Sequence, residues 1–227
     1  VYSADSHIAD HERVLLAGHG PSGACNSQFQ GIYEGIYGDS APNRSGRITV
    51  TPGPKWNDLM YHQMISQCTQ SLKTLETCLD KAERHAAAKK FDAGVLMASR
   101  LAPDMQPFTY QVQSACDYVK LAAAWLSGET PPKHEDNEQT SDELRVRIRK
   151  TVAFAESVKE AQYAGAGERK VSLSWAPGKV MNGQDYLLQM TMPNTYFHIA
   201  MAYAILRHNG VDVGKMDFLG PINLVDA

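Results

Sequence analysis

The chain has 227 residues, of which 43% are hydrophobic and 21% charged, and its formal net charge is −3 at pH 7. This length suits one domain with an extension or two small domains, and the composition excludes a largely disordered or fibrous chain. Because the chain is slightly acidic, it lacks the basic surface that binds nucleic acid or an anionic membrane, and we expect neither partner. No apolar stretch approaches the length of a membrane-spanning helix.

The N-terminal residues lack the basic, apolar and small-residue order of a secretory signal, which favours a cytoplasmic location. The four cysteines are Cys25, Cys68, Cys78 and Cys116, and no two of them form a CxxC pair. We therefore expect reduced thiols that serve as small core residues, rather than a disulfide framework.

Residues 1–55 hold much of the glycine and proline and show no sustained helical periodicity. We interpret them as an irregular N-terminal extension. They include a formal GxGxxG motif at residues 18–23, which can bind a dinucleotide only between a strand and a helix. Because Gly31, Gly35 and Gly38 follow and disfavour a helix, we interpret the motif as a flexible glycine-containing segment.

The composition changes near Trp56, and from there the sequence shows a helical pattern. Apolar residues then recur at steps of three or four, which predicts one helix of about seven turns with a single buried stripe. The stripe consists of Met60, Met64, Cys68, Leu72, Leu75, Leu79 and Ala82. A basic end near Lys89 and Lys90 suits a helix C-terminus.

A short segment over residues 92–100 precedes a second long helix, predicted from about residue 106 to Ser127 and stopped by Gly128. The acidic run that follows reads as a solvated loop. Thr140 and Glu143 match a capping box, so a third helix is expected to begin there.

Residues 170–175 and 179–181 flank a turn and predict a small hairpin. A fourth helix is expected over about residues 184–208, closing at Asn209 and Gly210. Four amphipathic helices bury their stripes most simply in a bundle, so the predicted fold is all-α: a four-helix bundle over residues 56–220, with a short tail over 221–227.

Two features of the fourth helix concern function. Pro193 should kink the helix and leave a carbonyl near Gln189 without its helical donor. His198, one turn later, shares a largely apolar stripe and should point inward. It is either a core histidine that hydrogen-bonds a neighbouring helix, or a ligand-binding or proton-transfer group in a cavity of the bundle.

On the second helix, Gln113, Asp117 and Lys120 form a polar line, and Gln111 lies beside the apolar stripe. Asp117 and Lys120 either form an ordinary surface ion pair or face inward, opposite His198. The chain contains no ExxH pair and no GxSxG elbow, which disfavours a di-iron carboxylate site and a serine hydrolase.

Several blocks resemble, in order, an uncharacterised (domain of unknown function) family of the DinB/YfiT-like superfamily of four-helix bundles. These blocks are residues 60–61, 79–82, 100–105, 111–113 and 193–211. The resemblance spans about residues 58–220. It implies an up-down-down-up bundle, with the hairpin before the last helix, and a homodimer.

Relatives in this superfamily include damage-inducible proteins and thiol-dependent transferases, and many hold a divalent metal through three histidines. By this resemblance His198 stands at one of those positions, Asn194 stands at a second, and Gln111 and Gln113 are nearest the third. Amide oxygens are weak ligands for nickel or zinc, so we expect no metal here and leave the cofactor open.

These observations predict a small-molecule-binding bundle in which His198 serves acid-base or transferase chemistry, with Asp117 or Asp104 orienting its ring. The expected binding residues are Asn194, Gln111, Gln113, Asp104 and Tyr203. The alternative is a non-catalytic helical scaffold or stress-related interaction protein, in which the polar residues only set the helix register.

Overall fold

The computed structural model describes residues 57–226. The expected N-terminal extension and its glycine motif lie outside the described residues. Within residues 57–226, no helix is both long and apolar enough to cross a membrane.

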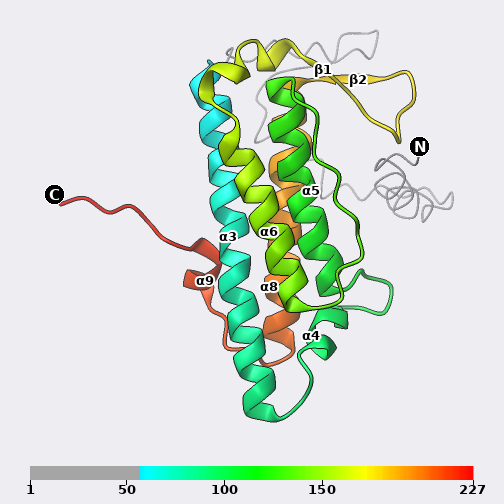
Figure 1. Ribbon diagram of the computed structural model, residues 1–227, viewed down its shortest axis with the longest axis vertical. Helices are drawn as coiled ribbons and strands as arrows, with labels where there is room; N and C mark the ends of the chain where they lie inside the picture. Colours follow the sequence, from blue (N-terminus) through cyan, green and yellow to red (C-terminus); the bar gives the residue numbers. More distant parts are fainter. Residues whose placement is uncertain (1–56, 227) are drawn as a thin grey trace, which may run out of the picture. The chain divides into compact units, whose positions relative to one another are not determined.

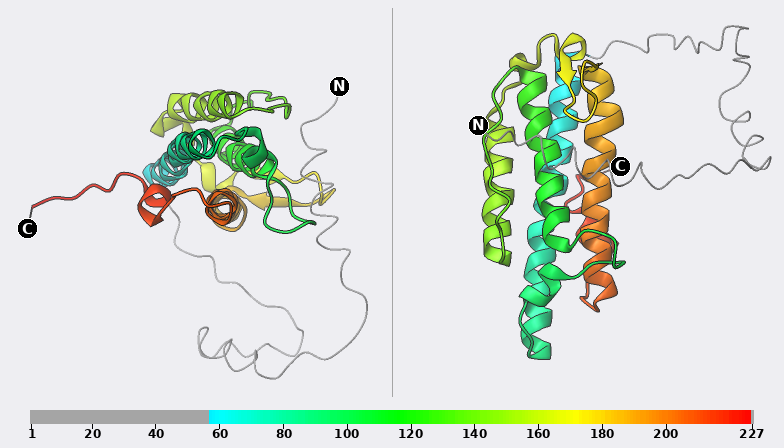
Figure 2. Two further views of the ribbon diagram at one scale, coloured as in Figure 1. Left: turned by 90° about the horizontal axis from the view of Figure 1, so that it is seen from below. Right: turned by 90° about the vertical axis from the view of Figure 1, so that its right-hand side faces the viewer.

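Four long helices build the described part of the chain (Figure 1). They are α3 (Asp58–Lys89), α5 (Phe108–Ser127), α6 (Ser141–Ser157) and α8 (Met192–His208). Both α3 and α5 pack against α6 and against α8. The helices α5 and α6 run in one direction, and α3 and α8 run in the other (Figures 1 and 2). The expected up-down-down-up bundle is confirmed.

The predicted stripe on α3 forms one wall of the core from Cys68 onward, whereas Met60 is exposed and the first turns bury Tyr61 and Ile65 instead. Cys68, Leu72, Leu75, Leu79 and Ala82 have no exposed surface. Burial of each such leucine side chain contributes about 2 kcal/mol, so the core of the bundle, rather than the intrinsic propensity of each helix, stabilises the fold.

The helix ends follow the sequence signals closely. In the capping box of α6, the amide of Glu143 donates to Thr140 Oγ1 at 3.2 Å, and the amide of Thr140 donates to Glu143 Oε2 at 2.9 Å. Helix α5 ends at Gly128, whose φ of 82° is the left-handed conformation that glycine adopts easily. Both predicted boundaries are confirmed.

Short elements complete the fold. Helix α4 (Gly94–Ala98) precedes α5, and α9 (Lys215–Leu219) precedes an exposed tail. The predicted hairpin is present: β1 (Lys170–Ser172), shorter than expected, pairs antiparallel with β2 (Val180–Asn182), which is shifted by one residue from its predicted place.

The last long helix differs from the simple kinked α-helix that we predicted. It begins with α7 (Gly183–Asp185) and continues as a π-helical stretch over Tyr186–Thr191, and α8 follows. Pro193 therefore lies in the first turn of α8, where the change of register accommodates its missing N–H. Asn194 Nδ2 donates to the carbonyl oxygen of Met190 at 2.7 Å, so a side chain supplies a donor at this break.

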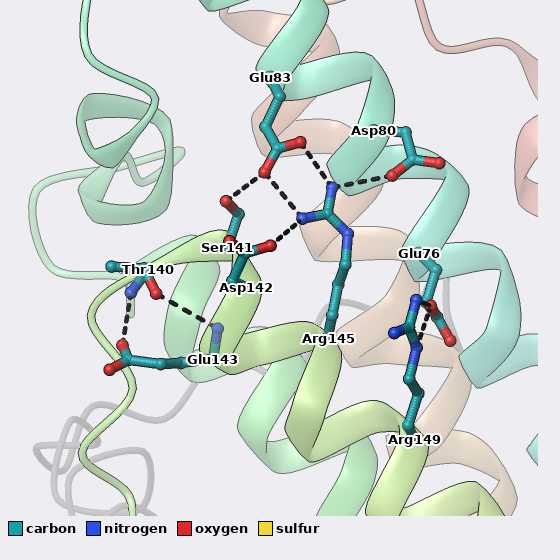
Figure 3. A network of polar contacts seen from close by, with 9 residues as sticks. All are labelled: Glu76, Asp80, Glu83, Thr140, Ser141, Asp142, Glu143, Arg145 and Arg149. Carbon is teal, nitrogen blue, oxygen red and sulfur yellow. Dashed lines mark hydrogen bonds and ion pairs between the residues drawn. The ribbon is translucent and has the colours of Figure 1, made fainter.

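An ion-pair ladder joins α3 to α6 (Figure 3). Arg145 lies 2.7 Å from Glu83 Oε2 and 2.8 Å from Asp80 Oδ1, and farther along α6 Arg149 Nη2 lies 2.7 Å from Glu76 Oε2. Hydrogen bonds from Arg145 hold the pKa of the Glu83 carboxyl below its ordinary value. The order of these pairs shows that α3 and α6 are antiparallel.

The two arginines of the ladder should contribute unequally to stability. The side chain of Arg145 is 11% exposed and that of Arg149 is 66% exposed. We expect Arg145→Met to lower the free energy of unfolding by about 1–2 kcal/mol, and Arg149→Met by less than about 0.5 kcal/mol, because exposed pairs are screened by solvent. Urea unfolding of both variants measures this difference, and equal losses would contradict it.

Candidate functional site

His198 lies on the side of α8 that packs against α5, and it is 9% exposed. Its Nδ1 is 2.8 Å from Gln111 Oε1 on α5. Gln111 Nε2 in turn donates to the carbonyl oxygen of Gln106 at 3.0 Å. Because this second bond turns the amide oxygen of Gln111 toward the ring, Nδ1 carries the proton in the neutral imidazole, and Nε2 carries the lone pair.

Aromatic rings surround this imidazole. Tyr118 stacks on it with centroids 5.8 Å apart, and Phe197 and Tyr110 contact it edge-on at 5.2 and 6.2 Å. We call His198, Gln111 and these three rings the His198 cluster. Phe197 is 51% exposed, so the cluster reaches the surface of the bundle. The ring of His198 is thus neither sealed among aliphatic groups nor turned out into water.

Other predicted binding residues lie around this cluster or apart from it. Asn194, one turn before His198, uses its amide nitrogen at the π-helical break. Tyr203 donates to the carbonyl oxygen of Val213 at 3.4 Å and packs edge-on against Phe218, so it holds the C-terminal segment. Asp104 is exposed in the turn before α5.

Asp117 and Gln113 belong to a second polar cluster. Asp117 Oδ1 is 2.6 Å from Lys120 Nζ and 2.9 Å from Arg147 Nη2, and Gln113 Nε2 donates to Glu138 Oε2 at 2.8 Å. The group that contacts Nδ1 of His198 is therefore Gln111, and not Asp117 or Asp104 as we expected. The Asp117–Lys120 pair is not an ordinary surface pair either, because the side chain of Lys120 is only 4% exposed.

Arg147 was missed by our sequence reasoning, although its spacing held a signal. It follows Leu144 by three residues and precedes Thr151 by four, and all three are buried. This spacing places a charged residue on the core-facing side of α6, where it must find partners.

The arrangement does not fit the three-histidine metal site that the resemblance implies. Among residues 57–226, no group of three His, Cys, Asp or Glu side chains could hold a metal ion. His198 Nδ1 is directed at an amide, and the amide nitrogen of Asn194 is directed at a backbone carbonyl. The polar atoms that stand at those positions make hydrogen bonds to one another and to the backbone, so we derive no step through a metal.

The described cysteines behave as core residues. Cys68, Cys78 and Cys116 are free and buried. Burial raises the pKa of the Cys68 and Cys116 thiols to about 12 and that of Cys78 to about 11. All three therefore stay protonated near pH 7 and are poor nucleophiles.

The bundle topology, the hairpin before the last helix and the imidazole between α5 and α8 define an all-α protein of the DinB-like class. The family described as "Domain of unknown function (DUF1993)" matches residues 60–219, and the chain belongs to this family. It is also similar to the crystal structure of a DinB family member from Shewanella denitrificans, with 42% identity and a TM-score of 0.73. That match covers 75% of this chain and 97% of the other. Comparison with curated proteins gives no match.

Proposed function

We propose that this protein binds a small organic molecule at the His198 cluster and uses His198 Nε2 as a proton acceptor in acid-base or group-transfer chemistry. The observation that carries the proposal is the relay from the Gln106 carbonyl through Gln111 to His198 Nδ1. The relay selects one tautomer and one orientation of the ring, as a base requires.

The composition of the cluster supports an organic ligand. Aromatic faces pack well against the apolar body of a small molecule, and a single polar group then sets its orientation. A well-packed apolar pair could replace Gln111 and His198 with little cost to stability. The presence of a buried amide–imidazole pair at this place therefore favours a role beyond packing.

Native mass spectrometry of the purified chain tests this function. We expect an additional mass that leaves on denaturation, is lost in His198→Ala and is kept in the control His208→Ala, an exposed histidine at the end of the same helix. NMR titration with phenol, benzoic acid and benzenethiol is the second arm, read at the ring signals of His198. No co-purified mass together with unchanged His198 signals would contradict the proposal.

The alternative function is a non-catalytic scaffold. The observation that favours it is that the Gln111–His198 bond links α5 directly to α8 and could serve only to set their register. In that case His198→Ala would lower stability and no tested molecule would bind. Binding that requires His198 would exclude this alternative.

The assembly remains a prediction. We expect a homodimer, and light scattering after gel filtration should give twice the mass of one chain. A mass of one chain at micromolar concentration would contradict it.

A further inference from the structure

The connection between α5 and α6 runs along the bundle instead of making a short turn. Because the two helices are parallel, residues 128–140 must run back along the bundle, beside α5 in Figure 1. We call residues 130–139 the strap. Most of its side chains are exposed, and a groove of about 800 Å³ lies between it and α6. The strap is therefore not held on the bundle by continuous apolar packing.

One guanidinium holds the strap to both helices. Arg147 Nη1 is 2.6 Å from Asp136 Oδ1 and 3.1 Å from Glu138 Oε1, both on the strap, and Nη2 is 2.9 Å from Asp117 Oδ1 on α5. Nη1 also lies 3.4 Å from the carbonyl oxygen of Glu135. The side chain of Arg147 is 1% exposed, so these contacts are only weakly screened by solvent.

The side chains of α5 near this contact are polar. Gln113 reaches the strap directly through Glu138, while Lys120 pairs with Asp117 at the same cluster. His134, on the strap, lies near two basic side chains, Lys120 and Arg147, and two acidic ones, Asp117 and Glu138. Its Nδ1 is buried and has no hydrogen-bond partner among the described residues.

We propose that the strap is an acid-sensitive cover, held closed by Arg147, that opens without unfolding the bundle and uncovers Lys120. Loss of the Arg147 contacts removes the ion pairs that hold Asp136 and Glu138 to α6 and leaves the apolar core of the four helices unchanged. The strap then keeps the Gln113–Glu138 hydrogen bond to α5 and the bond from its last residue to Glu143. The opened state exposes the polar line Gln113, Asp117 and Lys120 on α5.

The acid sensitivity comes from His134. Burial, with Lys120 and Arg147 nearby, lowers its pKa from 6.5 to about 4. In the opened strap its pKa returns toward 6.5, so the opened state binds more protons than the closed state between these two values. Closure is therefore fully stabilised above about pH 6.5 and weakens as the pH falls toward 4. Because His134 is partly exposed, we expect about a tenfold shift toward opening at pH 5.

Acetylation of lysines under brief labelling, followed by peptide mass spectrometry, tests the cover. The readout is the labelling of Lys120 relative to Lys133, which is 66% exposed on the strap and serves as an internal reference at each pH. We expect Arg147→Met to raise this ratio at least tenfold at pH 7 while circular dichroism stays unchanged. The control Arg145→Met breaks ion pairs with α3 instead and should leave the ratio unchanged.

Two further variants make the outcome decisive. His134→Gln should abolish the rise of the ratio between pH 7 and pH 5. If Arg147→Met does not fold, the double variant Asp136→Asn with Glu138→Gln removes both charged partners of Arg147 on the strap and should also raise the ratio. An unchanged Lys120 ratio in the folded variants, or a rise only in parallel with lost helicity, would overturn the proposal.

Discussion

Replacement of Gly183 with alanine is expected to lower the free energy of unfolding by about 3 kcal/mol or more. A Cβ at this position would lie 1.9 Å from the carbonyl oxygen of Ala166 and 2.8 Å from Leu126 Cδ2. The nearest atom belongs to the backbone and cannot move aside as a flexible side chain can. Gly183 begins the last helical stretch, so the strain would also displace the start of the element that carries His198.

Urea unfolding measures this loss, with Gly178→Ala as the matched control. Gly178 has a φ of 77°, but a Cβ there would meet no atom within 4 Å. Its replacement should therefore cost only the left-handed backbone penalty of about 1–2 kcal/mol. A smaller loss for Gly183→Ala than for Gly178→Ala would contradict the close approach of Gly183 to Ala166.

Gln111→Leu is expected to lower the free energy of unfolding by about 2–3 kcal/mol. The substitution removes the acceptor of His198 Nδ1–H, which is buried, and the amide donor to the Gln106 carbonyl, which is half-buried. The cost arises from polar groups that lose a partner away from water, rather than from lost packing volume.

A double-mutant cycle with His198→Phe separates this cause from general damage. When both partners are apolar no imidazole N–H is left without its acceptor, so the double variant should recover at least about 1 kcal/mol relative to the sum of the single losses. Urea unfolding of the unchanged chain, the two single variants and the double variant gives the coupling free energy between Gln111 and His198. Strictly additive losses would show that Gln111 and His198 do not stabilise each other.

The secondary structure was largely predictable because its signals are local. Thr140 and Glu143 lie within one turn of each other, and Gly128 needs only its own backbone freedom to end a helix. The π-helical stretch before Pro193 was not predictable in the same way, since its residues have no pattern that separates it from an ordinary helix. This stretch packs against α5, and such a tertiary contact has no signal in the local sequence.

The candidate site was predictable only in part. The apolar stripe of the last helix correctly placed His198 toward α5, and Gln111 was among the named partners. We had grouped Gln113 and Asp117 with it. Residues two positions apart on a helix differ by about 200° around its axis, so Gln111 and Gln113 face opposite sides of α5. Gln111 meets His198, and Gln113 meets Glu138 on the strap.

The topology of the bundle was expected only from the family resemblance. By itself, the sequence determined the four long helices, most of their ends and the inward direction of His198. Each of these depends on periodicity or on contacts within a few residues. Only the tertiary structure decided which polar side chains meet: Gln111 with His198, and Asp117 with Arg147. These pairs join residues far apart in the chain, and their partners depend on how each helix is rotated in the bundle and on the path of the strap between α5 and α6.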